Sequence, residues 1–104
     1  MDNKNFNVYV DIPALDKFAI HIEFLANVSE QAAVNLYASY EESLAILKMS
    51  PRICPIYSSK LYPKREFRHR IFGKRYRIVF EILNNDVYIF DIQDCRQDYD
   101  KNLV

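Results

Sequence analysis

Apolar and polar residues alternate at the start of the chain. In residues 6–11, the apolar Phe6, Val8 and Val10 are separated by Asn7 and a tyrosine. A period of two is typical of a strand that buries one face. We therefore predict a half-buried strand at residues 6–11.

The spacing of apolar residues then changes to three and four positions, which is the period of a helix. Asp11 and Pro13 supply a capping side chain and a proline for the first turn, and they predict a helix over about residues 13–27. Ser29 can cap a second helix, which we expect to end before Pro51. Because only a few residues separate them, the two helices should form an antiparallel hairpin. The two apolar stripes are Leu15, Phe18, Ala19, Ile22, Leu25 and Ala26, then Ala33, Leu36, Tyr37, Tyr40, Leu44 and Leu47.

Three prolines interrupt residues 51–64, which we predict to be a loop that crosses back to the sheet. Strand-like segments follow at residues 66–72, 76–83 and 87–94, separated by a glycine and by an Asn-Asn-Asp turn, so they predict consecutive hairpins. The residues predicted to face the helices are Phe67, His69 and Ile71, then Tyr76, Ile78, Phe80 and Ile82, then Tyr88, Phe90 and Ile92. The basic residues predicted to lie on the other face are Arg68, Arg70 and Arg77.

The element order is therefore β-α-α-β-β-β within one domain, residues 1–104. This order predicts an α+β fold in which a two-helix hairpin packs on one face of a small antiparallel sheet, with the first strand pairing at some point to give a mixed edge. The other face of the sheet is expected to be uncovered.

Charge is strongly segregated along a chain that is formally neutral, with 14 basic and 14 acidic side chains. Residues 52–77 carry nine basic residues and one acidic residue, a net charge of +8. Residues 1–51 carry three basic and seven acidic residues, and residues 78–104 carry two basic and six acidic residues, a net charge of −4 each. A positive middle third indicates a partner that bears phosphates or carboxylates.

The sequence argues against several other classes of protein. Cys54 and Cys95 are expected to be free thiols, and neither has zinc-binding spacing to His21 or His69. No signal peptide and no apolar stretch of membrane-spanning length is visible. We therefore expect a cytoplasmic protein with no metal, no cofactor and no membrane partner.

The last forty residues carry a resemblance to a known family. The segment "YRIVFEI" (76–82) is followed after a short turn by "VYIFDIQDCRQDY" (87–99). With the strand, two-helix, three-strand order, these segments resemble the RelE/ParE family, the toxins of type II toxin–antitoxin systems. The resemblance implies a growth-inhibiting toxin that is held inactive by a cognate acidic antitoxin. RelE-like members cleave messenger RNA on the ribosome, whereas ParE-like members poison DNA gyrase.

The resemblance also implies site residues. Ribonuclease members have basic residues two apart before the Tyr-Arg strand, the arginine of that strand, a basic residue after the last strand and an aromatic residue near the C-terminus. The corresponding catalytic candidates are Arg70, Arg77, Arg96 and Tyr99, although Gln97 aligns as well as Arg96 does. The remaining basic residues, candidates for contact with RNA or the antitoxin, are Lys64, Arg65, Arg68, Lys74 and Arg75.

Arginines suit the cleavage of RNA without a metal. A deprotonated 2′-OH attacks the adjacent phosphate, and a planar guanidinium can bridge two oxygens of the crowded phosphorane. Arg77 with Arg70 is assigned this task, and Tyr99 is assigned to act as a base or to stack on one. A ribosome-dependent endoribonuclease acting on mRNA is the predicted function.

Alternatives stay open for the function and for the roles of single residues. The chain could be a gyrase inhibitor without catalytic activity, or a family member without toxicity that acts only in a protein complex. Arg68 and Arg70 could form a solvated face or grip the antitoxin, and Arg77 could be tied to Glu81 or Asp94. His69 is expected to be a core histidine facing the helices.

Overall fold

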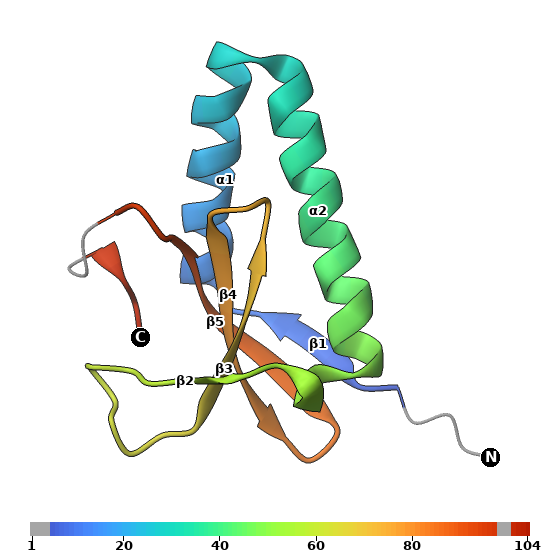
Figure 1. Cartoon of the computed structure of the whole chain (residues 1–104), viewed down its shortest axis with the longest axis vertical. Coiled ribbons are helices and arrows are strands. Elements are labelled where there is room, and N and C mark those ends of the chain that lie inside the picture. Colours follow the sequence, from blue (N-terminus) through green and yellow to red (C-terminus); the bar gives the residue numbers. More distant parts are fainter. Residues whose placement is uncertain (1–4, 98–100) are drawn as a thin grey trace.

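Two helices and a five-stranded sheet make up the fold in a computed structural model that describes residues 5–97 and 101–104 (Figure 1). The α+β class and the predicted element order are confirmed. The segment predicted to be a loop, residues 51–64, also holds a short 3₁₀ helix and a short edge strand. The elements are β1 (Asn7–Val10), α1 (Ile12–Val28), α2 (Glu30–Met49), the 3₁₀ helix η1 (Pro51–Ile53), β2 (Ile56–Tyr57), β3 (Phe67–Phe72), β4 (Tyr76–Leu83) and β5 (Asp86–Asp94).

The sheet has the strand order β1-β5-β4-β3-β2. β1 runs parallel to β5 and the other neighbours are antiparallel, which confirms the mixed edge. The pairing of β1 with β5 stops at Val10 and Ile89. Among the described residues, the second half of β5 therefore has no strand beside it on that side.

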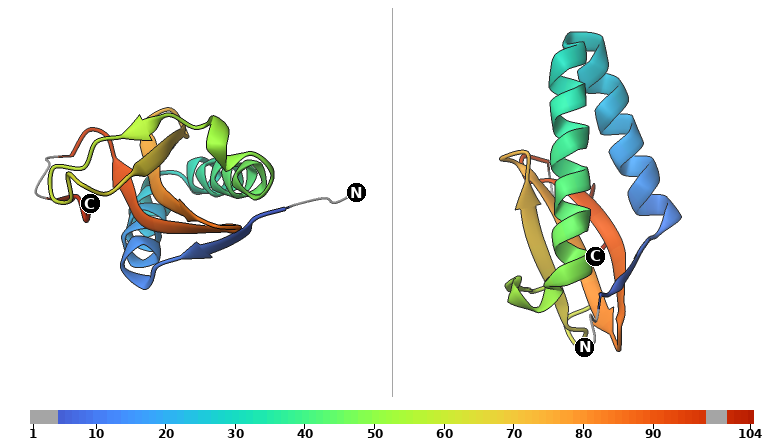
Figure 2. Two further views of the ribbon diagram at one scale, coloured as in Figure 1. Left: turned by 90° about the horizontal axis from the view of Figure 1, so that it is seen from below. Right: turned by 90° about the vertical axis from the view of Figure 1, so that its right-hand side faces the viewer.

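The helices form the predicted antiparallel hairpin, with Ser29 alone between them. The Ser29 Oγ accepts a hydrogen bond from the Ala32 amide (3.1 Å), while the Ser29 amide donates to the Leu25 carbonyl (2.8 Å). One residue thus ends α1 and caps α2. The hairpin lies on one face of the sheet and extends beyond it at the end that carries the β3–β4 turn (Figures 1 and 2).

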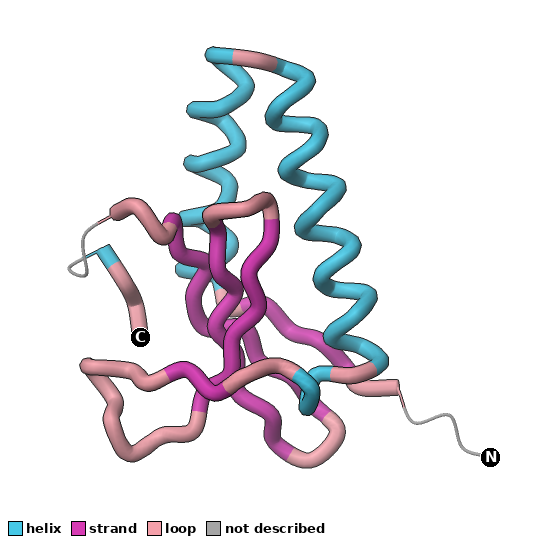
Figure 3. Tube along the Cα trace, in the orientation of Figure 1, coloured by secondary structure: helices cyan, strands magenta, loops and turns pink. Residues whose placement is uncertain are grey.

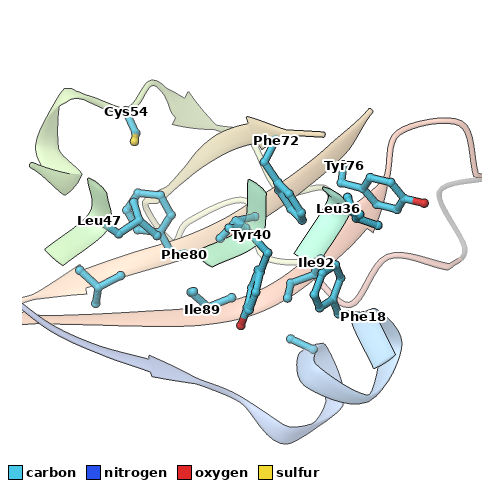
Figure 4. Packing of buried hydrophobic residues seen from close by; sticks show 13 residues of the cluster. Phe18, Leu36, Tyr40, Leu47, Cys54, Phe72, Tyr76, Phe80, Ile89 and Ile92 are labelled. Atoms are coloured by element: carbon cyan, nitrogen blue, oxygen red, sulfur yellow. The ribbon is translucent and has the colours of Figure 1, made fainter. Parts of the chain in front are cut away.

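The main hydrophobic core lies between this hairpin and the sheet (Figure 4). Tyr76, Ile78 and Phe80 of β4 point into it, as their alternation predicts. Phe18 of α1 and Tyr40 of α2 meet there with ring centroids 4.5 Å apart. We call this side of the sheet the helix-facing side.

A β-bulge in β5 changes which of its residues enter this core. Val79 pairs with Asp91 and Phe80 with Ile89, so the register skips Phe90. The extra residue puts Ile89 and Ile92 on the same face although they are three positions apart. The prediction that Tyr88 and Phe90 join Ile92 in this core is therefore wrong.

The register of β3 corrects a second prediction. Arg68 pairs with Phe80 and Arg70 with Ile78, and residues directly opposite each other on antiparallel strands share a face. Arg68 and Arg70 therefore lie on the helix-facing side. The prediction that they share the opposite face with Arg77 is wrong.

The prediction failed because β3 buries one phenylalanine on each face of the sheet. Phe72 enters the main core, and Phe67 is fully buried on the opposite face. His69 and Ile71 follow Phe67 by alternation, and Ile71 is 43% exposed. His69 is thus not a core histidine of the helix-facing side.

The opposite face of the sheet is also covered, contrary to the expectation that it is bare. Phe67, Val79 and Val104 form a second cluster there, with Tyr57 and Phe90 packed against it. The β2–β3 loop and the C-terminal residues lie side by side over this face (Figure 3), where the Tyr57 hydroxyl donates to the Val104 carbonyl at 3.2 Å. Coverage by a loop and a short terminal segment leaves room for a pocket.

Candidate functional site

A pocket of about 490 Å³ opens on this second face, which we call the sheet-face pocket. Tyr57 of β2, His69 of β3 and Arg77 of β4 line one part of it, and Asn102 and Val104 line another. The antiparallel strands bring the three side chains together because β3 lies between β2 and β4.

Arg77 is the central group of the sheet-face pocket. Its Nε donates a hydrogen bond to His69 Nδ1 (3.0 Å), and its Nη1 donates to Gln93 Oε1 (3.4 Å). The guanidinium carbon lies 5.6 Å from the centroid of the Tyr57 ring. Arg77 is therefore oriented from two sides and stacked against an aromatic ring, as planar guanidinium groups favour.

The tautomer of His69 follows from this contact. The Arg77 Nε–H can only donate, so His69 Nδ1 accepts and the neutral ring carries its proton on Nε2. Burial lowers the pKa of His69, and the charge of Arg77 lowers it further. Near neutral pH, His69 is an uncharged donor through Nε2.

Gln93 links Arg77 to a deeper polar cluster. Its Nε2 donates to the Tyr57 hydroxyl and to Asp91 Oδ2, both at 3.0 Å. Asp91 is fully buried, and it also accepts from the Leu103 amide (2.7 Å). Both bonds satisfy Oδ2 of the carboxylate, and Oδ1 still needs a partner, as burial of a charge requires.

Lys17 of α1 balances the charge of Asp91. Its Nζ lies 2.6 Å from Asp91 Oδ1 and donates to the Lys101 carbonyl at 2.9 Å. The side chain comes from the helix layer to a carboxylate on the other face, beside the half of β5 that β1 leaves unpaired. This ion pair ties α1, β5 and the C-terminal residues together.

Arg70 of β3 and Arg77 of β4, which were both assigned to catalysis, do not lie together. Arg70 donates from Nε to Ser43 Oγ of α2 (3.0 Å), on the helix-facing side. Arg68 donates to the carbonyls of Arg52 (3.2 Å) and Cys54 (2.7 Å). Only Arg77 of this set lines the sheet-face pocket.

The other basic candidates are dispersed. Arg65 holds both carboxylate oxygens of Glu81 (2.7 and 3.2 Å) and stacks on Phe67 and Phe90 at 4.9 and 5.0 Å. Arg96 is exposed in the turn after β5, with Nε 3.6 Å from Asp94 Oδ1. The pair with Glu81 and the stacking on two phenylalanines give Arg65 a structural role.

The remaining candidates fall into three places. Gln97 is exposed beside Arg96, and its backbone amide donates to the Asp94 carbonyl (2.9 Å). Lys64 is exposed in the β2–β3 loop, and Lys74 and Arg75 lie at the β3–β4 turn. Tyr99 lies outside the described residues.

The residues that sequence reasoning missed are polar groups in apolar surroundings. Asp91 and Gln93 interrupt an apolar strand, and the predicted core phase of Tyr88, Phe90 and Ile92 puts them on the face that was expected to be uncovered. Two polar side chains flanking Ile92 were instead the signal of a buried network. Tyr57 gave no such signal, because it is about 20 positions from Arg77 in a segment without periodicity.

The amino-acid sequence matches a known family along most of the chain. The model of the family described as "ParE toxin of type II toxin-antitoxin system, parDE" matches residues 10–99. The chain belongs to the ParE toxin family. Membership confirms the resemblance to RelE/ParE toxins, and it implies an antitoxin as partner.

No curated protein sequence matches the toxin. Neither helix is long and apolar enough to cross a membrane, judged over residues 5–97 and 101–104. Over the same residues, His, Cys, Asp and Glu side chains form no group of three that could hold a metal ion.

Proposed function

We propose that this toxin inhibits DNA gyrase by binding to it and cleaves no nucleic acid itself. The observation that supports the proposal is the dispersal of the basic groups. Arg70 and Arg77 lie on opposite faces of the sheet, and Arg96 is near Asp94 in a turn.

Catalysis would require these groups to converge. Attack by a 2′-OH needs a base, a proton donor and positive charge around a single phosphate. Each preorganised donor aimed at the developing charge contributes roughly 10²–10³ in rate, but only if it reaches that atom. Binding to a protein has no such condition, because charges spread over several elements can meet an extended acidic surface.

A ribosome-dependent, metal-free endoribonuclease is the second candidate, and the sheet-face pocket favours it. Arg77 would place positive charge beside the phosphate, and neutral His69 would donate a hydrogen bond from Nε2 to a phosphate oxygen while keeping its proton. The Tyr57 hydroxyl lines the same pocket. Tyr99 remains the candidate base or stacking group.

Induction of the toxin, followed by parallel assays of DNA and mRNA, tests the proposal. We expect loss of negative supercoiling, double-strand DNA breaks and intact messages, and the purified toxin should inhibit gyrase in supercoiling assays. A His69→Gln variant should keep gyrase inhibition within about threefold if the sheet-face pocket is not catalytic.

The opposite pattern would overturn the proposal. Messages cut within codons on translating ribosomes, with at least 10²-fold less cutting in His69→Gln and Arg77→Ala, would establish the ribonuclease. Lys48→Gln, an exposed change at the far end of α2, is the matched control. Induction without any growth defect would instead support a member that acts only in a protein complex.

A further inference from the structure

A row of three aromatic rings lies on the opposite face of the sheet, at the edge formed by β1. Tyr9 and Tyr88 are register partners on β1 and β5, and their rings stack with centroids 5.3 Å apart and planes 18° apart. Phe90 continues the stack beyond Tyr88, with centroids 6.3 Å apart and planes 23° apart. We call these three residues the aromatic row. None of them lines the sheet-face pocket.

Tyr9 keeps one side of its ring open. β1 has β5 on one side and, within the described chain, no strand on the other (Figure 2). Tyr9 is 50% exposed, and over residues 5–97 and 101–104 its ring stacks on Tyr88 alone. Stacking between neighbouring strands stabilises the sheet, but it uses only one side of the ring. A half-exposed tyrosine is typical of protein interfaces, because a rigid ring offers a large contact area at a low cost in conformational entropy.

The carboxylate nearest to Tyr9 along the chain is also unused. Asp11 follows Tyr9 by two positions in extended backbone (φ −64°, ψ 143°), and its amide donates to the Ile89 carbonyl at 2.9 Å. The alternation of β1 therefore places both side chains on one face, about 6.6 Å apart along the strand. Asp11 occupies the N-cap of α1, but its side chain makes no capping hydrogen bond, contrary to the expectation from sequence. Among the described residues its carboxylate has no ion pair or hydrogen bond.

The border of the aromatic row is negative. Asp86 accepts a hydrogen bond from the Tyr88 hydroxyl at 3.3 Å. Arg65 stacks on the last ring of the row at 5.0 Å, but both carboxylate oxygens of Glu81 hold its guanidinium, at 2.7 and 3.2 Å. The pair of Arg65 and Glu81 is neutral, so Asp11 and Asp86 set the sign of the charge. A surface of stacked rings with a negative border is complementary to a cation.

A pocket of about 200 Å³ adjoins the row at Phe90. Its lining joins the carboxylate of Asp11 to the flat surfaces of Pro13, Tyr62 and Phe90. Arg65 already lies against two of these rings, 5.5 Å from the centroid of Tyr62 and 5.0 Å from that of Phe90, so guanidinium stacking suits this surface. An apolar side chain next to the bound cation fits this pocket.

We propose that the aromatic row binds an arginine of gyrase, presented by a segment in which an apolar residue adjoins it. The guanidinium stacks on the open side of the Tyr9 ring and donates to both oxygens of Asp11, as the planar fork of arginine allows and the point charge of lysine does not. The inference rests on the proposed function, which supplies gyrase as the partner. The negative border disfavours an acidic antitoxin and the phosphates of nucleic acids. The basic groups of the toxin need an acidic surface, so they and the aromatic row contact different parts of gyrase.

Inhibition of purified gyrase by the full chain tests the proposal, measured as the toxin concentration that halves supercoiling. Tyr9→Ser should raise this concentration about 3- to 30-fold, the range for a cation–π contact from exposed to desolvated. Asp11→Asn should raise it about 10-fold, and asparagine is as good an N-cap residue as aspartate. Two controls should stay within about twofold of wild type: Tyr9→Phe keeps the ring, and Asp16→Asn removes an exposed carboxylate of α1 outside the row.

A double variant tests whether Tyr9 and Asp11 hold the same group. If one arginine contacts both, Tyr9→Ser/Asp11→Asn should weaken inhibition by little more than the larger single effect, and by much less than the product of the two. Losses that multiply would show separate contacts and would overturn the assignment to one arginine. Antitoxin affinity should stay within about twofold in all variants, and its loss with unchanged gyrase inhibition would overturn the proposal.

Chemical protection of the wild-type chain covers the case in which a variant fails to fold. Tetranitromethane should nitrate Tyr9 in the free toxin but not in the complex with gyrase, whereas Tyr37, 48% exposed on α2, should react equally in both. Nitration of Tyr9 in the complex, or inhibition within about twofold of wild type in folded Tyr9→Ser and Asp11→Asn, would overturn this inference alone. A wild-type toxin that leaves gyrase uninhibited would overturn it together with the proposed function.

Discussion

The two faces of the sheet are buried by different kinds of interaction. On the helix-facing side, aromatic and aliphatic side chains from both helices pack on β4 and β5. On the opposite face, a continuous set of hydrogen bonds runs from His69 through Arg77 and Gln93 to the Asp91–Lys17 ion pair. Both faces exclude water from residues of β5, but the second adds a buried polar network to a smaller apolar cluster.

The difference decides how each face responds to change. Apolar contact is non-directional, so its loss scales with the volume removed. The polar face depends on direction, because each donor there needs a particular acceptor and a lost partner leaves a buried polar group unsatisfied. The same contrast separates what each face does: the first fixes the fold, and the second lines the sheet-face pocket.

The largest effect is expected on the helix-facing side. Phe80→Ala should lower the free energy of unfolding by about 3–5 kcal/mol, because the fully buried ring leaves a cavity. Chemical denaturation measures the change. Leu83→Ala, at an exposed position of the same strand, should change stability by no more than about 0.5 kcal/mol. A loss below about 1 kcal/mol for Phe80→Ala would show that this face is not the dominant core.

Breaking the ion pair of the opposite face should rank second. Lys17→Met should cost about 3 kcal/mol, the low end for a buried pair, because Asp91 keeps its bonds from Leu103 and Gln93. Asp16→Asn, the exposed neighbour on α1, serves as the control.

A double variant separates the ion pair from general packing. In Lys17→Met/Asp91→Asn no charge is left unpaired and an amide oxygen can still accept from Leu103 and Gln93, so part of the lost stability should return. A single variant as stable as wild type, or a double variant less stable than Lys17→Met alone, would contradict the idea that an unpaired buried carboxylate is the cost.

Sequence patterns anticipated the helix-facing side better than the other. Both helices were predicted within a few residues of their ends, and the alternation of β4 placed Tyr76, Ile78 and Phe80 in the core. The same reasoning failed for β3. Phe67 and Phe72 lie five positions apart, and an odd separation puts them on opposite faces of the strand. In β5 the bulge at Phe90 reverses the alternation midway, and nothing in the local pattern locates it.

The candidate site was anticipated only at Arg77. Its tyrosine partner is on a two-residue edge strand, which is too short to give a periodic signal. Gln93 and Asp91 are buried because they bond to groups distant in sequence, namely Arg77, Tyr57 and Lys17. Pairing between distant residues satisfies buried polar groups, and a linear pattern does not record it.

The smallest expected effect is a loss of stability as pH falls, and it compares His69 of the opposite face with His21 of α1. Burial is the main cause that lowers the pKa of both, with Arg77 adding to the effect at His69 and Asp94 opposing it at His21. The unfolded chain, with its histidines near the ordinary pKa of 6.5, binds protons that the folded chain resists. Stability should therefore be fully present above about pH 7 and decline as pH falls through 6.5.

Removing His69 should flatten this decline more than removing His21. Protonated His69 would turn Nδ1 into a donor that faces the Arg77 Nε–H, so the central contact of the sheet-face pocket breaks. His21 instead packs edge-on against Tyr76 at 5.4 Å, and within the described residues it accepts no hydrogen bond from an arginine. Urea denaturation at pH 7.5 and 5.5 of wild type, His69→Gln and His21→Gln measures the difference. Carboxylates titrate alike in all three proteins, so they cancel in the comparison. An equal pH dependence of stability in wild type and His69→Gln would contradict this expectation. It would mean that His69 Nδ1 takes up a proton from solvent freely, so that the hydrogen bonds of this face do not close it to water.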